Sequence, residues 1–139
     1  MTTAPAPMGP IQKAVYTRLA GDAAYMALVA GGPYDGVPEQ AALPCTDLGE
    51  FVETPDNRHR GFGRQTVITL HTWSRERGYA EVQRIGAAIM AALDHQPLSI
   101  DGEHHVDTLY EFGQTLTDPD PVGDVRHLVQ RFRILTEQP

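Results

Sequence analysis

The segment 65–74, QTVITLHTWS, constrains the fold of this chain more than any other stretch. It is rich in β-branched and aromatic residues, which favour strands, and the side chains of a strand alternate between two faces. One face carries Val67, Thr69, His71 and Trp73, and the other carries Ile68 and Leu70. Because both faces carry apolar groups, the pattern predicts a strand in the centre of a sheet.

A helical region is predicted near the N-terminus, where apolar residues recur at spacings of three and four. These residues are Ile11, Ala14, Val15 and Leu19. Pro10 suits the first turn of this helix, and Gly21 interrupts it. Asp22 then has the position of an N-cap for a second short helix over 23–29. The chain is therefore expected to begin with a broken helix or a helical hairpin.

A longer helix is predicted over 79–93, where apolar residues again follow the helical period. Its apolar residues are Val82, Ile85, Ile89, Met90 and Leu93, and polar residues occupy the other side. Such an amphipathic helix is expected to lie on a sheet.

Further segments have the composition of strands. They are, in chain order, a brief strand around Tyr34, then 45–53, 98–100, 104–116 and 126–136. Gly49 indicates a bulge or close packing, and the pair Asp101-Gly102 suits a tight hairpin. Alternation groups Val106, Tyr110 and Phe112 on one face of their strand, and Leu128, Phe132 and Ile134 on one face of the last.

The order of these elements predicts an α+β fold. We expect an antiparallel or mixed β-sheet of about four to five strands, with an N-terminal helical segment and one long amphipathic helix packed on it. A chain of 139 residues is near the commonest size for one domain. We therefore expect a single domain over 11–139, preceded by a flexible arm over 1–10 that contains three prolines.

Composition disfavours several classes of protein. The net charge of -7 has the wrong sign for a protein that grips a nucleic-acid backbone. No apolar run approaches the length of a membrane span, so no membrane partner is expected. The only cysteine, Cys45, excludes an intrachain disulfide and is compatible with a reducing cytoplasm.

The sequence offers little sign of a catalytic, cofactor or metal site, and none is expected. His104 and His105 are adjacent on a strand and so point to opposite faces. Cys45 could act as a nucleophile with a histidine, but a half-buried structural thiol is the more typical reading. Asp118 and Asp120 could act as an acid–base pair or bind calcium, yet a turn explains them better.

Two loops are the candidate contact elements. The long hairpin loop predicted over 54–64 carries Arg58, Arg60, Phe62 and Arg64. Its arginines could bind phosphates or carboxylates of a partner, and a solvated loop fits the pattern equally well. The loop that begins DPDP carries Asp118 and Asp120. We expect both loops and the N-terminal arm to become ordered on binding.

The chain resembles the small tail-completion or tail-terminator proteins of long-tailed phages and gene transfer agents, from about Pro10 to Glu137. The resemblance rests on short motifs in a fixed order. They are Leu19 and Asp22, Tyr34-Asp35, Val37-Pro38, Leu43-Pro44, Leu48-Gly49-Glu50, the strand 67–74, Gly78, Ala92-Leu93, Asp118-Pro-Asp120, His127 and Arg131-Phe-Arg133.

This resemblance implies a structural virion protein without catalysis. Such proteins form a ring, usually of six subunits, that caps the tail tube, stops its growth and joins it to the head. The implied partners are other copies of the chain, the tail tube protein and a head-completion or stopper protein, with DNA only passing through. The implied location is the tail or neck of the virion, after assembly in the host cytoplasm. A head-tail adaptor or stopper, a small cytoplasmic binding module and an enzyme with an unrecognised site are the alternatives.

Overall fold

The computed structural model describes residues 6–59 and 61–139 of the chain. Its elements are α1 (Met8–Ala20), α2 (Ala23–Met26), β1 (Gly31–Tyr34), β2 (Cys45–Pro55), β3 (Gly63–Ser74), α3 (Ala80–Leu93), β4 (His104–Asp118) and β5 (Val125–Glu137). The strands form one five-stranded sheet in the order β1-β2-β3-β5-β4, with β3 in the centre. Only β1 and β2 pair in parallel, so the sheet is mixed and the predicted α+β class is confirmed.

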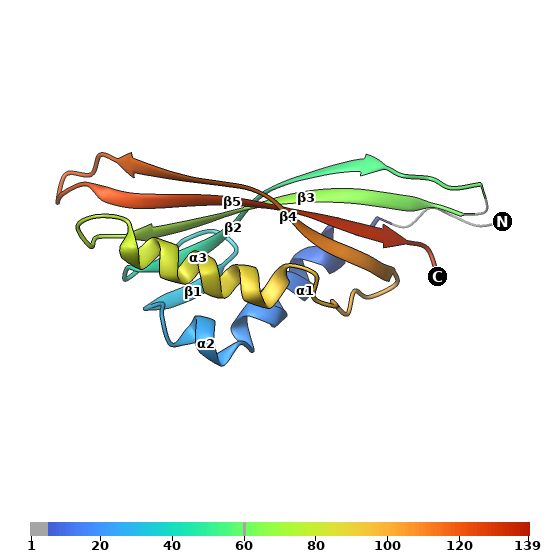
Figure 1. The fold of residues 1–139 in the computed structure, drawn as a ribbon, viewed down its shortest axis with the longest axis horizontal. Helices are drawn as coiled ribbons and strands as arrows, with labels where there is room; N and C mark the ends of the chain where they lie inside the picture. Colours follow the sequence, from blue (N-terminus) through green and yellow to red (C-terminus); the bar gives the residue numbers. More distant parts are fainter. Residues whose placement is uncertain (1–5, 60) are drawn as a thin grey trace.

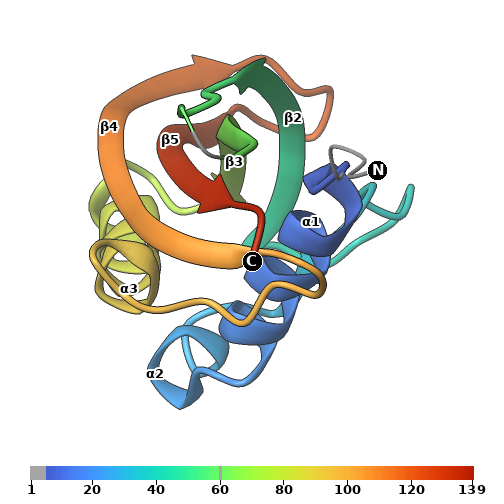
Figure 2. The same cartoon turned by 90° about the vertical axis from the view of Figure 1, so that its right-hand side faces the viewer.

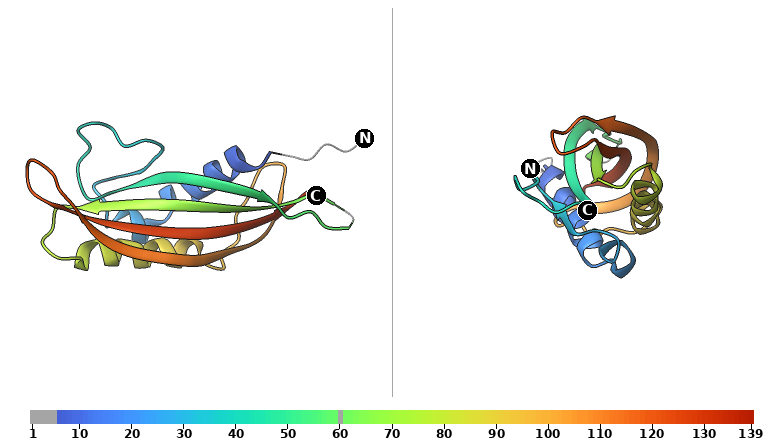
Figure 3. Two further views of the ribbon diagram at one scale, coloured as in Figure 1. Left: turned by 90° about the horizontal axis from the view of Figure 1, so that it is seen from above. Right: turned by 90° about the vertical axis from the view of Figure 1, so that its left-hand side faces the viewer.

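The helices lie on one side of the sheet and leave the other side uncovered (Figure 1). Figure 3 shows this second side, across which β2, β3, β5 and β4 run side by side; we call it the helix-free face. The strands are long and strongly twisted, so β2 and β4 sweep around β3 and β5 when the sheet is viewed along its length (Figure 2).

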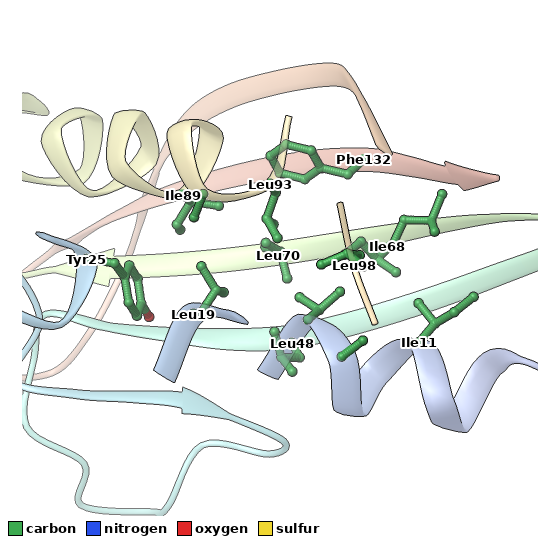
Figure 4. Close-up of a cluster of buried hydrophobic side chains, with 14 of the residues drawn as sticks. Ile11, Leu19, Tyr25, Leu48, Ile68, Leu70, Ile89, Leu93, Leu98 and Phe132 are labelled. Carbon is green, nitrogen blue, oxygen red and sulfur yellow. The ribbon is translucent and has the colours of Figure 1, made fainter. Parts of the chain in front are cut away.

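The hydrophobic core fills the space between the helices and the sheet (Figure 4). Its fully buried members include Ile11, Val15, Leu19, Ile68, Ile85, Ile89, Leu93, Phe132 and Ile134. These are the residues that the helical and strand periodicities place on the inner faces. The predicted inner sides of both helices are therefore confirmed.

The N-terminal helical region begins earlier than predicted. α1 starts at Met8, so the last part of the expected arm is helical. The first five residues of that arm lie outside the described residues. Asp22 caps α2 as predicted, because its Oδ1 accepts a hydrogen bond of 2.8 Å from the backbone N–H of Tyr25. α2 ends at Met26 and is shorter than predicted.

The predicted strand over 98–100 is wrong. This segment has no regular secondary structure and pairs with no strand among the described residues. Leu98 and Ile100 instead bury their side chains in the core, with 8% and 5% exposure. The turn at Asp101-Gly102 does form, since Gly102 has a positive φ of 75°. It connects the core segment to β4 and does not close a hairpin.

The predicted grouping of Val106, Tyr110 and Phe112 on one face of β4 is also wrong. A register shift lies at Val106, and another separates Tyr110 from Phe112. Each adds one residue to β4 and reverses the alternation after it. Tyr110 consequently meets the buried ring of Phe132, with centroids 5.5 Å apart. Phe112 lies on the opposite face under the Arg131 guanidinium, 4.5 Å from its ring centroid.

Candidate assembly interfaces

The two loops predicted as contact elements lie at opposite ends of the sheet (Figure 1). One is the turn 56–62 of the β2–β3 hairpin, which is shorter than predicted because both strands extend into the expected loop. The other is the turn 119–124 of the β4–β5 hairpin. The arginines predicted in the first loop and the aspartates predicted in the second are therefore far apart in the structure.

At the β2–β3 end, Arg58 has 61% of its side chain exposed. Among the described residues, it is the most exposed of those predicted to make contacts. Its Nε lies 3.0 Å from Glu137 Oε1, and a guanidinium nitrogen lies 3.9 Å from Asp56 Oδ2. Ion pairs this exposed contribute little to stability. The Arg58 guanidinium is thus presented at the surface rather than used inside the fold. Arg60 lies outside the described residues.

Phe62 and Arg64 belong to the base of the same hairpin and are half-buried. The backbone carbonyl of Phe62 accepts a 2.8 Å hydrogen bond from the N–H of Gln138. Arg64 Nη1 donates to Asn57 Oδ1 at 3.1 Å. These contacts tie the hairpin to the C-terminal end of β5 and hold its base in place.

At the other end, Asp120 shapes the turn of the β4–β5 hairpin. Its Oδ1 accepts a 3.0 Å hydrogen bond from the backbone N–H of Val122 and lies 3.5 Å from the Arg75 guanidinium. The hydrogen bond from the Val122 N–H holds the pKa of Asp120 below its usual value, and the positive charge of Arg75 adds to this shift. Val122 is 83% exposed at the tip of this hairpin. The turn predicted for the DPDP segment thus presents an apolar side chain between charged groups.

A row of polar side chains crosses the helix-free face and includes one predicted residue, Asp118. It takes one residue from each of four neighbouring strands: Glu50 of β2, His71 of β3, His127 of β5 and Asp118 of β4. His71 Nε2 lies 3.0 Å from Glu50 Oε2. His71 Nδ1 lies 2.7 Å from His127 Nε2. His127 Nδ1 lies 2.8 Å from Asp118 Oδ2, an ion-pair contact rather than a well-aligned hydrogen bond. We call these residues the Glu–His–His–Asp row.

The two imidazoles of this row are largely shielded from solvent, with 16% of the His71 side chain and 11% of the His127 side chain exposed. The Trp73 indole stacks on His127 at a centroid distance of 4.9 Å and donates to Asp118 Oδ2 at 3.4 Å. Burial lowers the pKa of His127, although Asp118 opposes the shift. The hydrogen bond from His71 lowers the pKa of Glu50.

Sequence reasoning did not find this row, because His71 and His127 are 56 residues apart in the chain. The sequence did contain one sign of this row, since the alternation of β3 places His71 and Trp73 on the same face of that strand. Which histidine would meet them depends on the pairing of β3 with β5, and a single sequence does not reveal that pairing.

Gly49 makes room for the row. A Cβ at this position would lie 2.5 Å from His71 Cδ2 and 2.7 Å from the backbone oxygen of Thr69. The register of β2 shifts at this point, so the bulge or close packing predicted from Gly49 is confirmed. The glycine thus lets the His71 ring lie against the backbone of β2.

Gly49→Ala is therefore expected to destabilise the protein by about 1–3 kcal/mol, since the Thr69 backbone cannot move aside cheaply. Urea unfolding followed by Trp73 fluorescence would measure the change. Gly61→Ala is the matched control, because no atom lies within 4 Å of a Cβ there. Equal stability of the two variants would contradict this account of Gly49.

Cys45, the candidate nucleophile, is fully buried rather than half-buried. Burial raises the pKa of its thiol to about 11, with Asp47 adding to the shift. An activated nucleophile requires the opposite shift. Within residues 6–59 and 61–139, no three His, Cys, Asp or Glu side chains are arranged to hold a metal ion. No helix in the described part of the chain is long and apolar enough to span a bilayer.

The fold is that of a virion protein. A solved structure described as the virion of a native gene transfer agent particle contains a chain that superimposes on this one with a TM-score of 0.82. The two chains are 25% identical, and the match covers 95% of this chain and 98% of that one. No curated protein sequence matches significantly.

Residues 13–137 match the family of tail completion protein gp17. The chain belongs to this family, so the resemblance inferred from the sequence is confirmed. It is a structural protein of a phage or gene transfer agent tail, and its location is the virion tail. A tail component contacts other tail or head proteins, which directs attention to the two hairpins as the surfaces for such contacts.

Proposed function

We propose that this protein forms a ring of identical subunits, expected to be hexameric, that caps the tail tube, ends its polymerisation and joins it to the head. The protein acts by binding and performs no catalysis. Its partners are other copies of the chain, the tail tube protein on one side and a head-completion or stopper protein on the other.

The observation that carries this proposal is the placement of the two hairpins at opposite ends of one sheet (Figure 1). A subunit that joins two different structures needs two contact surfaces that face away from each other. The β2–β3 hairpin offers exposed Arg58 with Arg64, and the β4–β5 hairpin offers Asp120 with Val122. The side chains offered at the two ends differ, which supports contact with two different partners.

The surface beside the β4–β5 hairpin also suits protein binding. A hollow of about 360 Å³ lies between this hairpin and the connection that precedes β2. Trp73, Leu43 and Val125 contribute its apolar wall, and Arg75 and Asp120 contribute charge. Aromatic and apolar side chains inside a polar rim are typical of the centre of a protein interface.

The net charge of -7 fits a channel through which DNA passes without adhering, since like charges repel the phosphate backbone. DNA is accordingly proposed to move past the ring and not to be held by it.

Electron microscopy of particles assembled without this gene product tests the proposal. We expect tail tubes that exceed the normal length and filled heads that lack tails, both restored by the wild-type chain supplied in trans. Tubes of normal length that fail to join heads would contradict capping and favour an adaptor or stopper. Normal, joined tails would overturn the proposal entirely.

A further inference from the structure

Two strands of the sheet, β2 and β4, have edges that are open to a further strand. β4 borders the sheet and pairs with β5 on one side only. β2 pairs with β3 on one side, and on the other side β1 covers only its beginning, from Cys45 to Asp47. Figure 3 shows β2 and β4 along opposite borders of the helix-free face. Each copy of the chain therefore carries two strand edges on which another strand can pair.

On β4, the outward positions follow from one hydrogen bond and the alternation of the strand. Successive residues of a strand turn their backbone N–H and C=O groups to opposite sides. The N–H of Tyr110 donates to Asp94 Oδ1 at 2.9 Å, so Tyr110 points away from β5. The register shift between Tyr110 and Phe112 adds one residue. Beyond the shift, the outward positions of β4 are Gly113, Thr115 and Thr117.

On β2, the outward positions follow from the hairpin end. The N–H of Asp56 donates to the carbonyl of Gly63 at 2.9 Å, so the preceding residue, Pro55, points away from β3. Proline has no N–H and is tolerated in a sheet at such an outward position. Glu53 and Phe51 are the next outward residues of β2. The two open stretches are thus 51–55 of β2 and 113–117 of β4.

The directions of the strands favour the pairing of β4 with β2. β2 and β3, β3 and β5, and β5 and β4 are all antiparallel, so β4 runs opposite to β2. A neighbouring copy in the same orientation therefore places its β2 antiparallel to β4 and continues the sheet. All β2–β3 hairpins then lie on one side of the assembly and all β4–β5 hairpins on the other. Two copies joined through their β4 edges would instead point in opposite directions and stop at a dimer.

We propose that residues 113–117 of β4 pair with residues 51–55 of β2 of the next copy, as antiparallel strands, and that this contact closes the ring. The inference rests on the proposed function, which requires a ring with two different sides. The contact joins different surfaces of the two copies, and a contact of this kind generates rings. Backbone hydrogen bonds supply its binding energy, as in other cases of strand addition.

The contact also covers an exposed apolar side chain. Val52 is 59% exposed and lies on the helix-free face, since it is paired in register with Val67. Two registers join Thr115 to an outward residue of β2 that has an N–H, either Phe51 or Glu53. They place Val52 opposite Gln114 or Leu116 of the next copy, which lie on the helix-free face of β4.

Disulfide cross-linking in assembled particles tests the pairing. Val52→Cys is combined in one chain with Gln114→Cys or with Leu116→Cys, because directly opposite residues have a Cα separation that suits a disulfide. On a non-reducing gel, we expect one of the two combinations to give a ladder of dimers, trimers and larger species. Cys45 is fully buried and should not take part. Val52→Cys with Val106→Cys is the matched control and should stay monomeric, since Val106 is 42% exposed on β4 outside 113–117.

The absence of a ladder from both combinations, or species no larger than dimers, would overturn the pairing. These outcomes differ from failure of the proposed function, in which particles without the gene product keep tails of normal length joined to heads. Overlong tubes without the gene product, together with no ladder, would mean that the protein caps the tube through a different contact between copies.

Removal of one outward N–H provides a second test. Thr115→Pro deletes a donor that points away from β5, so the hydrogen bonds within the subunit should remain. We expect this variant to give overlong tubes, as in particles without the gene product. Thr115→Ala keeps the N–H and should assemble normally. A Thr115→Pro chain that retains the wild-type circular dichroism spectrum and assembles as well as Thr115→Ala would overturn the proposal, and the cross-linking result does not depend on whether this variant folds.

Discussion

Replacing Phe132 with alanine is expected to lower the free energy of unfolding by about 3–5 kcal/mol, which would leave little of the stability of a domain of this size. Phe132 is fully buried on β5, and its ring meets the edge of Tyr110. The substitution would leave a cavity between β5 and α3, the helix that packs on this strand. The cost combines lost burial with a void that the surrounding side chains fill only in part.

Urea unfolding followed by circular dichroism would measure this effect. Val52→Ala is the matched control on β2, because Val52 is 59% exposed and its truncation should change stability by less than about 0.5 kcal/mol. The midpoint should shift for Phe132→Ala while the slope of the transition is retained. A loss below about 1 kcal/mol for Phe132→Ala would contradict the placement of this ring in the core.

Charge reversal at the two ends of the sheet is expected to abolish two different steps of particle assembly. The double variant Arg58→Glu, Arg64→Glu changes the β2–β3 end, and Asp120→Lys changes the β4–β5 end. Since the proposed partners differ, one variant should yield overlong tubes and the other should yield tails of normal length detached from heads. Like charges brought together at an interface cost several kcal/mol, so each defect should be nearly complete.

Electron microscopy of complemented particles would distinguish the two defects. Each variant should keep the wild-type circular dichroism spectrum, because the altered side chains lie at or near the surface. The unfolding midpoints should fall only slightly, since the lost contacts are the turn hydrogen bond that Asp120 accepts and the bond from Arg64 to Asn57. Lys13→Glu on the exposed side of α1 is the charge-reversal control and should assemble normally. The same defect in both variants, or none in either, would exclude the hairpins as separate contact surfaces.

Local patterns in the sequence were sufficient to predict most of the elements. The period of α1 and α3 identifies their buried sides, since a helix on a sheet repeats its apolar contacts every three or four residues. The mixture of apolar groups on both faces of the segment 65–74 identifies the central strand. Asp22 could be predicted as the N-cap of α2, because the contact involves a backbone N–H only three residues further along the chain.

The features that escaped prediction depend on distant parts of the chain. The bulges of β4 are set by its pairing with β5, so alternation alone placed Tyr110 and Phe112 on the same face. Leu98 and Ile100 are apolar residues typical of a strand, yet they bury their side chains in the core and do not pair at a sheet edge. The contact of His71 with His127 likewise follows from strand order and could not be read from either segment.

The pairing of β3 with β5 determines how this protein responds to force. The ladder runs without interruption from Gly63 opposite Glu137 to Ser74 opposite Arg126. Tension between the two hairpins would pull the beginning of β3 and the beginning of β5 in opposite directions, parallel to the strands. Antiparallel hydrogen bonds lie perpendicular to that pull, so they are sheared together instead of being unzipped one by one. The β3–β5 ladder is thus expected to resist elongation along the line that joins the two hairpins.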